Sequence, residues 1–250
     1  MIILVCGLPK SASTYAAEMA CMLAETAGHQ QLRLRSRVAE AGGSDKRFVA
    51  TLDRSTMDRI LGVIRREDLL VLKTHAPYTA FLAPYLEEGA IVPVVTFRDS
   101  WDAALSVYEA GVRARERGDF SQNFHRFDTI PAAIDATARN WEWTQTWLDC
   151  GHGIDLEFES LVRRPRAAAV RIASAMGLPE DSASALDFMA STRKPYNYNV
   201  GVAGRAADVF SDEERAYARK HLQRAVSWME TWKAANAPEC VTHEGLRADG

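Results

Sequence analysis

Short, nearly unbroken apolar runs constrain the fold of this chain more than any other feature. They lie at residues 2–6, 69–73 and 91–97, and a fourth, weaker run lies at 154–158. Runs of this length are typical of strands that are buried on both faces of a parallel sheet. Segments with apolar residues at helical spacing separate them, and strands that alternate with helices form crossover units of one sheet. The sequence therefore predicts an α/β fold.

The predicted fold is a single three-layer domain in which helices flank a mostly parallel central sheet. We expect this domain over residues 1–235 and a flexible tail over 236–250. The polar stretch 30–54 is predicted to be irregular or to hold a short strand at 48–50. The helices are expected at residues 11–27, 57–66, 78–86, 101–117, 130–149 and 167–176.

Composition argues against several classes of protein. The 250 residues carry 30 Lys and Arg against 33 Asp and Glu, and this net charge of −3 disfavours a general nucleic-acid binder. No apolar stretch reaches the length of a membrane span, and the N-terminus lacks the basic segment of a signal peptide. The cysteines show no metal-ligand spacing, so we expect reduced thiols, no metal and a cytoplasmic protein. They are Cys6, Cys21, Cys150 and Cys240.

The first chemically informative segment, GLPKSASTY, begins at Gly7 between the first predicted strand and the first predicted helix. Backbone N–H groups at a helix start, together with Lys10 and several hydroxyls, form a cradle for an anion. The alternative is a plain helix start capped by Ser11 or Ser13. The pattern G-x-x-x-x-G-K-[ST] of ATP-binding loops is not met, because Lys10 comes too early and no glycine directly precedes it.

The second segment begins where the third predicted strand ends. Arg98 follows that strand, and Ser106 lies eight residues later in the next predicted helix. Ligands of α/β proteins bind at the carboxyl ends of strands, and arginine suits bidentate recognition of phosphate. Two helical turns separate the residues, so both can face one phosphate. The alternative is a surface salt bridge of Arg98 beside an unrelated Ser106.

The third segment, Lys73-Thr74-His75-Ala76-Pro77, follows the second predicted strand. A lone histidine in this position is more often structural than catalytic. Because His75 lies at a strand end and the two phosphate segments flank it, we interpret it as a general base. Histidine titrates near neutral pH, as such a base requires.

These three segments, in this order, resemble the motifs of the PAPS-dependent sulfotransferases. GLPKSASTY resembles the PKSGTTW loop that binds the 5′-phosphosulfate, the Arg98 segment resembles the 3′-phosphate motif, and KTHAP resembles the K-T-H-x-P segment of cytosolic-type members. The resemblance implies a P-loop-like phosphosulfate-binding loop. It also implies transfer of a sulfuryl group from 3′-phosphoadenosine 5′-phosphosulfate (PAPS) to a hydroxyl or amine of a small-molecule acceptor. The implied product is adenosine 3′,5′-bisphosphate (PAP).

The resemblance also assigns roles to residues. It implies that His75 is the catalytic base and that Lys10 and Lys73 neutralise charge during transfer. Ala12 replaces a family glycine, and Tyr15 replaces a tryptophan that stacks on adenine. The implied nucleotide-binding residues are Lys10, Ser11, Ala12, Ser13, Thr14, Tyr15, Arg98, Ser106, Phe158, Gly204 and Arg205.

Resemblance is weaker outside these segments. Residues 140–148 resemble a tryptophan-rich family helix, and residues 156–165 resemble a Y-E-x-L…D-P segment in which Phe158 replaces a tyrosine near adenine. Residues 199–213 align with the family's R-K-G-x-x-G-D-W-K-N-x-F-T-x-E, but Asn199-Val200 replaces the Arg-Lys pair that clasps the 3′-phosphate. Arg193-Lys194 or Arg205 are the candidates to supply the missing charge.

Two other functions remain open from the sequence. A small-molecule kinase would need ATP and Mg²⁺, with Asp99 as the candidate metal ligand, and it would leave Arg98 and Ser106 unexplained. A nucleotide-binding module without turnover would agree with the altered 199–213 segment. The sequence indicates neither the acceptor nor the oligomeric state. The aromatic residues expected near the acceptor are Tyr78, Phe81, Phe120, Phe124 and Phe127.

Overall fold

A four-stranded sheet forms the centre of the molecule. In a computed structural model, which describes residues 1–42, 46–120, 123–179, 182 and 204–236, the strand order is β2-β1-β3-β4 and every pair is parallel. The predicted α/β fold with a parallel sheet is therefore confirmed. The strands are β1 (Ile2–Gly7), β2 (Leu70–Lys73), β3 (Ile91–Phe97) and β4 (Ile154–Glu157).

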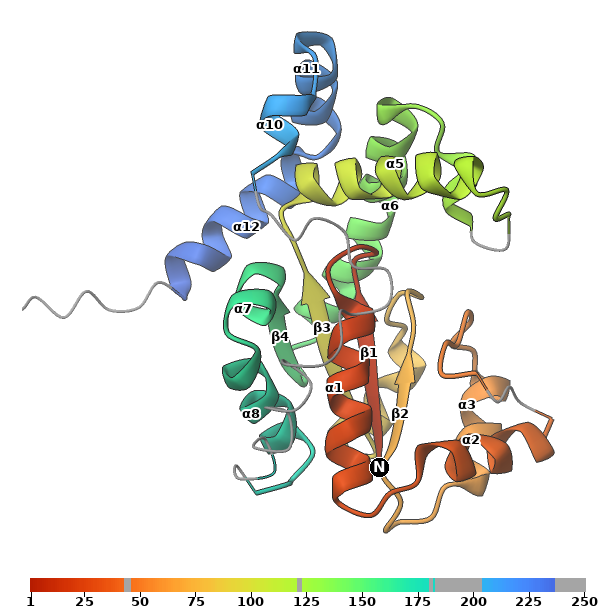
Figure 1. Ribbon diagram of the computed structural model, residues 1–250. Coiled ribbons are helices and arrows are strands. Elements are labelled where there is room, and N and C mark those ends of the chain that lie inside the picture. The colour runs from red at the N-terminus through yellow and green to blue at the C-terminus, as the bar shows by residue number, and fades with distance from the viewer. Residues whose placement is uncertain (43–45, 121–122, 180–181, 183–203, 237–250) are drawn as a thin grey trace, which may run out of the picture.

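Helices cover both faces of this sheet (Figure 1). One face packs against α1 (Ser13–Thr26) and α8 (Pro165–Ala175), with α7 (Phe158–Arg163) beside them. The other face packs against α2, α3, α4 and α6, which makes three layers. These helices span Gln31–Glu40, Arg54–Val63, Ala83–Glu87 and Ile130–Asp149, respectively.

The first strand shows why the apolar runs predicted buried strands. Successive side chains of a strand point to opposite faces of the sheet. Ile3 and Val5 pack into the core under α1, whereas Ile2, Leu4 and Cys6 pack into the core on the α3 side, and all five are fully buried. A strand covered on both faces must be apolar at every position.

The helix α5 (Ser100–Glu116) crosses the carboxyl ends of the strands (Figure 1). The Asp99 side chain accepts hydrogen bonds from the first-turn N–H groups of Trp101 and Asp102, which fixes where this helix begins. Three C-terminal helices lie beside it, and α11 begins with a capping box formed by Ser211 and Glu214. They are α10 (Ala206–Val209), α11 (Asp212–His221) and α12 (Gln223–Ala235).

The prediction for residues 30–54 was partly wrong, because α2 forms there. Buried Gln31 explains its position: the side chain donates to the carbonyl oxygen of Leu69 at 2.8 Å and accepts from the N–H of Val71 at 2.9 Å. The helix thus docks on the edge strand through one polar residue that carries no hydropathy signal. The short strand expected at 48–50 is reduced to one parallel bridge between Phe48 and Lys73.

Other boundaries also differ from the prediction, and the helix expected over 57–66 is α3, three residues earlier. Phe158 begins α7 and does not end β4. The helix expected over 78–86 begins later, as a 3₁₀ turn η1 (Ala80–Leu82) that continues into α4. Residues 237–250, where the tail was predicted, lie outside the described residues. No helix in the described part of the chain is both long and apolar enough to cross a membrane.

Gly7, the last residue of β1, gives a prediction about stability. Its φ is +121°, and a Cβ atom there would lie 2.0 Å from the carbonyl oxygen of Thr96. We expect Gly7→Ala to lower the free energy of unfolding by more than about 2 kcal/mol, because strand β3 must move away. Urea unfolding measures this change.

The matched control is Gly62→Ala in α3, where nothing lies within 4 Å of the added Cβ. Alanine is the better helix former, so this variant is expected to be at least as stable as wild type, by up to about 1 kcal/mol. A Gly7→Ala variant as stable as wild type would contradict the close approach of β1 and β3.

Candidate active site

The predicted site residues lie around the carboxyl ends of β1, β2 and β3. The strand order β2-β1-β3-β4 makes the chain leave β1 in one direction and β3 in the other. In open α/β sheets the crevice at such a reversal of strand order is where ligands bind. Gly7 ends β1 and Phe97 ends β3, so the loop after β1 and the start of α5 lie on the two sides of this switch point, a region that we call the crevice.

The loop between β1 and α1 has the backbone of an anion-binding loop. Lys10 and Ala12 both adopt left-handed conformations, with φ of 70° and 63°. Ala12 is the N-cap of α1 and makes no side-chain hydrogen bond to the helix. A helix start without a side-chain cap leaves first-turn N–H groups for a ligand, and the helix dipole favours an anion there. The left-handed backbone explains the glycine of the family motif at this position, and Ala12 costs about 1 kcal/mol relative to it.

Ser11 anchors this loop to the end of β3. Its hydroxyl is fully buried, donates to the carbonyl oxygen of Leu8 at 2.5 Å and lies 2.7 Å from the hydroxyl of Thr96. Thr96 in turn donates to the carbonyl oxygen of Cys6 at 3.2 Å. The Ser11 side chain therefore holds the loop in place.

The remaining residues of the loop motif begin α1. Ser13 is buried, and Tyr15 packs at the edge of the core beneath α1. The Thr14 hydroxyl accepts a hydrogen bond from the Lys73 ammonium at 3.2 Å. This bond joins the first and third sequence segments, since Lys73 ends the neighbouring strand β2.

Two partly buried lysines bring positive charge to the crevice. Burial lowers the pKa of Lys10 to about 8, and the charges of Arg113 and Arg98 act in the same direction. Burial likewise lowers the pKa of Lys73 to about 8, helped by Arg47 and Lys10. Concentrated positive charge with this much desolvation is typical of a site for an anion.

His75 lies beside the lysines as a neutral imidazole. Its Nδ1 is 2.7 Å from the carbonyl oxygen of Gly7, and because a carbonyl oxygen only accepts, Nδ1 carries the proton. Nε2 is then the atom with the lone pair. Burial, followed by the charge of Lys73, lowers the pKa of His75 to about 3, against the effect of the Gly7 bond. The imidazole is therefore neutral at neutral pH, with one proton, on Nδ1, and an unprotonated Nε2.

Arg98 lies at the other side of the crevice and is only 5% exposed. Its guanidinium carbon is 4.0 Å from the centre of the Phe158 ring, and its terminal nitrogen is 3.6 Å from a carboxylate oxygen of Asp102. A guanidinium stacked on an aromatic face is held in one orientation. Two residues predicted from separate motifs, Arg98 and Phe158, are thus in direct contact.

Asp102 connects Arg98 to the C-terminal segment. Its buried carboxylate accepts from the N–H of Gly204 at 2.6 Å and from the N–H of Ala206 at 3.0 Å. Arg205, between them, forms an ion pair with Glu109 of α5, with nitrogen–oxygen distances of 2.5 and 3.4 Å. The structure therefore places the predicted residues Gly204 and Arg205 beside α5. The other candidates for the missing charge, Arg193 and Lys194, lie outside the described residues.

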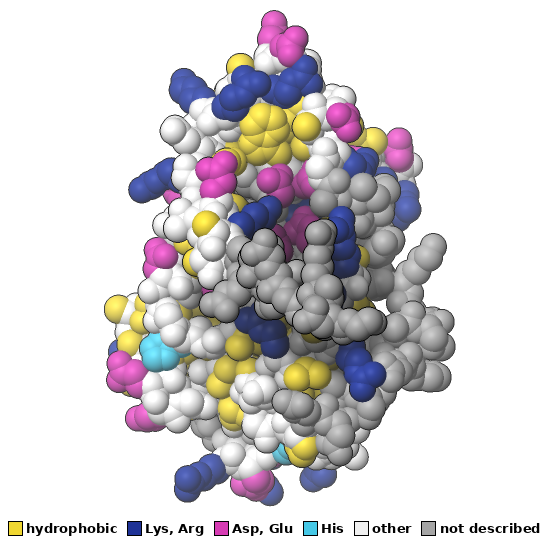
Figure 2. All heavy atoms as spheres, turned by 90° about the vertical axis from the view of Figure 1, so that its left-hand side faces the viewer, with side chains coloured by type: hydrophobic (Ala, Val, Ile, Leu, Met, Phe, Trp, Pro, Cys, Tyr) yellow, Lys and Arg dark blue, Asp and Glu magenta, His cyan; other side chains and the backbone are white. Residues whose placement is uncertain are grey.

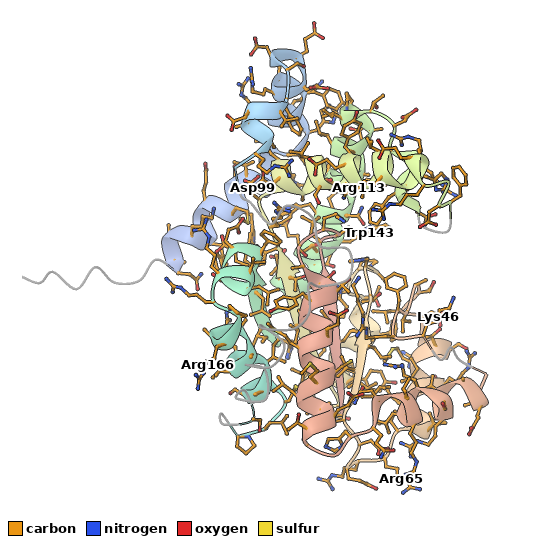
Figure 3. All side chains as sticks on the ribbon, viewed as in Figure 1. Lys46, Arg65, Asp99, Arg113, Trp143 and Arg166 are labelled. Carbon is orange, nitrogen blue, oxygen red and sulfur yellow. The ribbon has the colours of Figure 1, made fainter. Side chains whose placement is uncertain are left out.

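One face of α5 carries the polar residues of this side. Ser106, which is buried, follows Asp102 by one turn, and Glu109 and Arg113 continue the same row at helical spacing. Figure 3 shows Arg113 on the side of α5 that faces the body of the protein. The row leads from Arg98 towards Lys10, so α5 spans both ends of the crevice.

Aromatic side chains lie against the catalytic candidates. The Phe124 ring, in the 3₁₀ turn η2 (Asn123–Arg126), is 5.2 Å from the Lys10 ammonium. The Phe48 ring is 5.6 Å from the Lys73 ammonium and 5.7 Å from the His75 ring. Phe124 is thus one of the aromatic residues expected near the acceptor, and it lies beside Lys10.

Other members of that aromatic set have different surroundings. Tyr78 packs edge-on against the buried Trp147, and Phe81 lies under the guanidinium of Arg54. Phe120 is 64% exposed and contacts His125. None of these three contacts involves Lys10, Lys73 or His75.

Sequence reasoning missed four residues of the site: Phe48, Asp102, Glu109 and Arg113. Asp102, Glu109 and Arg113 had a usable signal, because they follow Arg98 at the same helical spacing that singled out Ser106. Phe48 had none, since only the bridge to Lys73 brings it to His75.

A cavity of about 720 Å³ lies beside Asp102. Lys10, Lys73 and His75 do not line it, whereas Asp102 and Gly204, on the Arg98 side of the site, do. Its walls come from the start of α5 and from the C-terminal helices. They are formed by Asp99, Trp101, Asp102, Gly204, Ala206, Ala207, Ala216, Arg219, Lys220, Gln223, Val226 and Ser227.

Comparison with known proteins identifies the fold. Retinol dehydratase in complex with androsterone and inactive cofactor PAP superposes with a TM-score of 0.54 at 14% identity, over 89% of this chain and 80% of that one. Mouse sulfotransferase SULT7A1 complexed with PAP superposes with a TM-score of 0.52 at 11% identity, over 92% and 88%. This chain has the sulfotransferase fold. No protein-family model matches the sequence, and no curated protein is similar enough to be matched.

The partly buried lysines of this sulfotransferase fold give a second prediction. We expect Lys10→Met to make the nucleotide-free protein more stable at pH 7, because the variant no longer buries a charge. The pKa of Lys10 is about 8 in the folded protein and near 10.5 when unfolded, so the charge is buried at every pH below 8. The gain in the free energy of unfolding from Lys10→Met is therefore complete below pH 8 and shrinks between pH 8 and 10.5.

Urea unfolding of both proteins at pH 7 and pH 9.5 measures this difference. Lys220→Met is the control, since Lys220 is exposed on α11, and this variant is expected to leave stability nearly unchanged. A Lys10→Met variant less stable than wild type at pH 7 would mean that Lys10 contributes net stability through contacts such as the one to Phe124.

Proposed function

We propose that this protein is a PAPS-dependent sulfotransferase that acts on a hydroxyl or amine of a small molecule. One observation carries the proposal: the crevice has two cationic ends with a neutral histidine beside one of them. Lys10, Lys73 and the uncapped start of α1 form one end, and Arg98 with Ser106 forms the other. A ligand with phosphate groups at two positions fits this arrangement, as does the PAP bound to the compared structures.

The 5′-phosphosulfate is proposed to bind at the lysine end. First-turn N–H groups of α1, with Ser13 and Thr14 as the predicted contacts, would surround it, and Ser11 would contribute by holding the loop in place. Lys10 and Lys73 would offset its charge. When bound, PAPS supplies an activated sulfuryl group whose transfer breaks the bond between sulfur and the 5′-phosphate oxygen.

The 3′-phosphate is proposed to bind Arg98 and Ser106. Stacking on Phe158 orients the Arg98 guanidinium before the ligand arrives. Tyr15 and Phe158 are the predicted contacts of adenine, and both offer an aromatic face.

His75 is proposed to act as the general base. Its Nε2 would take the proton of the acceptor hydroxyl while the new oxygen–sulfur bond forms. The Gly7 carbonyl keeps the proton of the neutral ring on Nδ1, so Nε2 is available to accept. The pKa of about 3 in the nucleotide-free protein rises when a polyanion binds nearby, because an opposite charge favours the protonated ring.

Phe48 and Phe124 support an acceptor with an apolar body next to its reacting group. Each ring lies near one of the two lysines, and Phe48 also lies near His75. Aromatic faces bind the apolar surface of a ligand, and a few polar groups then fix its orientation. Androsterone and retinol are present in the retinol dehydratase structures, and both have an apolar body.

The reducing cytoplasm is the proposed compartment. Cys6, Cys21 and Cys150 are all free thiols. Structural disulfides are rare in reducing compartments and common in secreted proteins, so three unpaired thiols favour the former.

Calorimetric titration tests the donor. We expect metal-independent binding of adenosine 3′,5′-bisphosphate in preference to ADP or to ATP with Mg²⁺. Arg98→Ala is expected to weaken the bisphosphate about 100-fold, because a buried, charge-assisted phosphate contact is lost. Arg65→Ala, at the opposite end of the molecule (Figure 3), is the control and is expected to bind as wild type does.

Preference for ATP with Mg²⁺ would instead favour the kinase, and binding of neither nucleotide would refute the donor assignment. Arg98→Lys keeps the charge without the fork geometry. If Arg98→Lys loses less bisphosphate affinity than Arg98→Ala but still binds less tightly than wild type, Arg98 binds the phosphate and is not only structural.

Turnover with labelled PAPS tests the base. We expect His75→Ala to lower kcat about 10²- to 10⁴-fold while the affinity for the bisphosphate stays within twofold. His29→Ala, beyond the far end of α1, is the matched control and is expected to keep full activity. Full-rate transfer by His75→Ala would show that another group accepts the proton.

A further inference from the structure

The C-terminal segment brings a cation to the row of polar residues on α5. Arg98 and the N–H of Gly204 contact the same oxygen of Asp102, at 3.6 and 2.6 Å. The two groups therefore lie within about 6 Å of each other. Since Ala206 also donates to Asp102, the backbone around Arg205 is fixed beside Arg98.

The side chain of Arg205 lies along α5 towards Ser106. Its guanidinium binds Glu109 at 2.5 and 3.4 Å, and Glu109 is one helical turn beyond Ser106. Residues three apart on a helix are neighbours, with Cβ atoms roughly 5–6 Å apart. The Arg205 guanidinium thus flanks the space between Arg98 and Ser106, where the proposed 3′-phosphate binds.

Glu109 is a carboxylate in surroundings that are otherwise rich in cations. Its negative charge raises the pKa of Lys10, opposing burial and the charges of Arg113 and Arg98, and its hydrogen bond raises the pKa of Arg205. The side chains of Glu109 and Arg205 are 21% and 27% exposed, so an incoming ligand can reach the pair. Basic and acidic side chains are interleaved over the middle of the face shown in Figure 2.

We propose that Glu109 and the 3′-phosphate of the nucleotide compete for Arg205. This inference rests on the proposed function and adds a residue to it. In the nucleotide-free protein Glu109 holds Arg205, and on binding Arg205 turns to the phosphate and joins Arg98. Arg205 thereby supplies the cation that Asn199-Val200 does not provide. A phosphate monoester carries more negative charge than a carboxylate and accepts the same fork of hydrogen bonds, so it wins the competition.

The test is calorimetric titration with adenosine 3′,5′-bisphosphate and with AMP, which lacks the 3′-phosphate. For Arg205→Ala we expect about tenfold weaker binding of the bisphosphate and AMP affinity within twofold of wild type. For Glu109→Gln we expect about fivefold tighter binding of the bisphosphate, because a partly exposed ion pair no longer has to open. In the double variant the Glu109→Gln effect is expected to vanish.

A matched ion pair elsewhere serves as the control. Arg215 and Asp212 on α11 also pair at 2.5 Å, and Arg215→Ala and Asp212→Asn are expected to bind both nucleotides as wild type does. Thermal unfolding of each variant checks that it is folded. Arg205→Lys retains the charge and is expected to bind the bisphosphate with intermediate affinity.

Two results would overturn the inference alone. One is wild-type bisphosphate affinity in folded Arg205→Ala. The other is an increase in bisphosphate affinity from Glu109→Gln that persists in the Arg205→Ala background. That result would mean that Glu109 acts on the nucleotide through its negative charge and not by holding Arg205. If wild type binds neither nucleotide, the proposed function fails and the inference fails with it.

Discussion

The contact between the end of β1 and the end of β3 determines most of this structure. Gly7 lies against the backbone of Thr96 so closely that no side chain fits between them, and the hydroxyls of Ser11 and Thr96 join the following loop to the same strand. With the loop held there, α1 starts at the crevice with its N–H groups towards it. The same Gly7 carbonyl orients His75. Backbone packing, anion binding and the state of the proposed base are therefore parts of one arrangement.

Electrostatics in the crevice oppose stability. Lys10 and Lys73 bury positive charge near one another, and both would be easier to accommodate as apolar residues. A polyanionic ligand removes this penalty because it supplies the missing negative charge. Proteins commonly retain such unfavourable sites where binding depends on them. The low pKa of His75 has the same origin, and it too would return towards its ordinary value when an anion binds.

Asp102 organises the opposite side. One buried carboxylate binds the Arg98 guanidinium and two backbone N–H groups of the segment that contains Arg205. A buried carboxylate with several donors is strongly held, so the spacing between Arg98 and the C-terminal segment is well defined. The family motif has an Arg-Lys pair where this chain has Asn199-Val200. Arg205 is a cation on the segment that Asp102 holds beside Arg98.

The sequence by itself determined the parallel sheet, because strands covered on both faces must be apolar throughout, and it located Lys10, Lys73, His75 and Arg98 at strand ends. It also predicted the helix α6 over residues 130–149, as observed. Only the tertiary structure decided how these residues meet. The bridge that brings Phe48 to His75 and the docking of α2 through Gln31 depend on contacts between residues distant in sequence, which local periodicity does not encode. The Glu109–Arg205 pair is of the same kind, since 96 residues separate its partners.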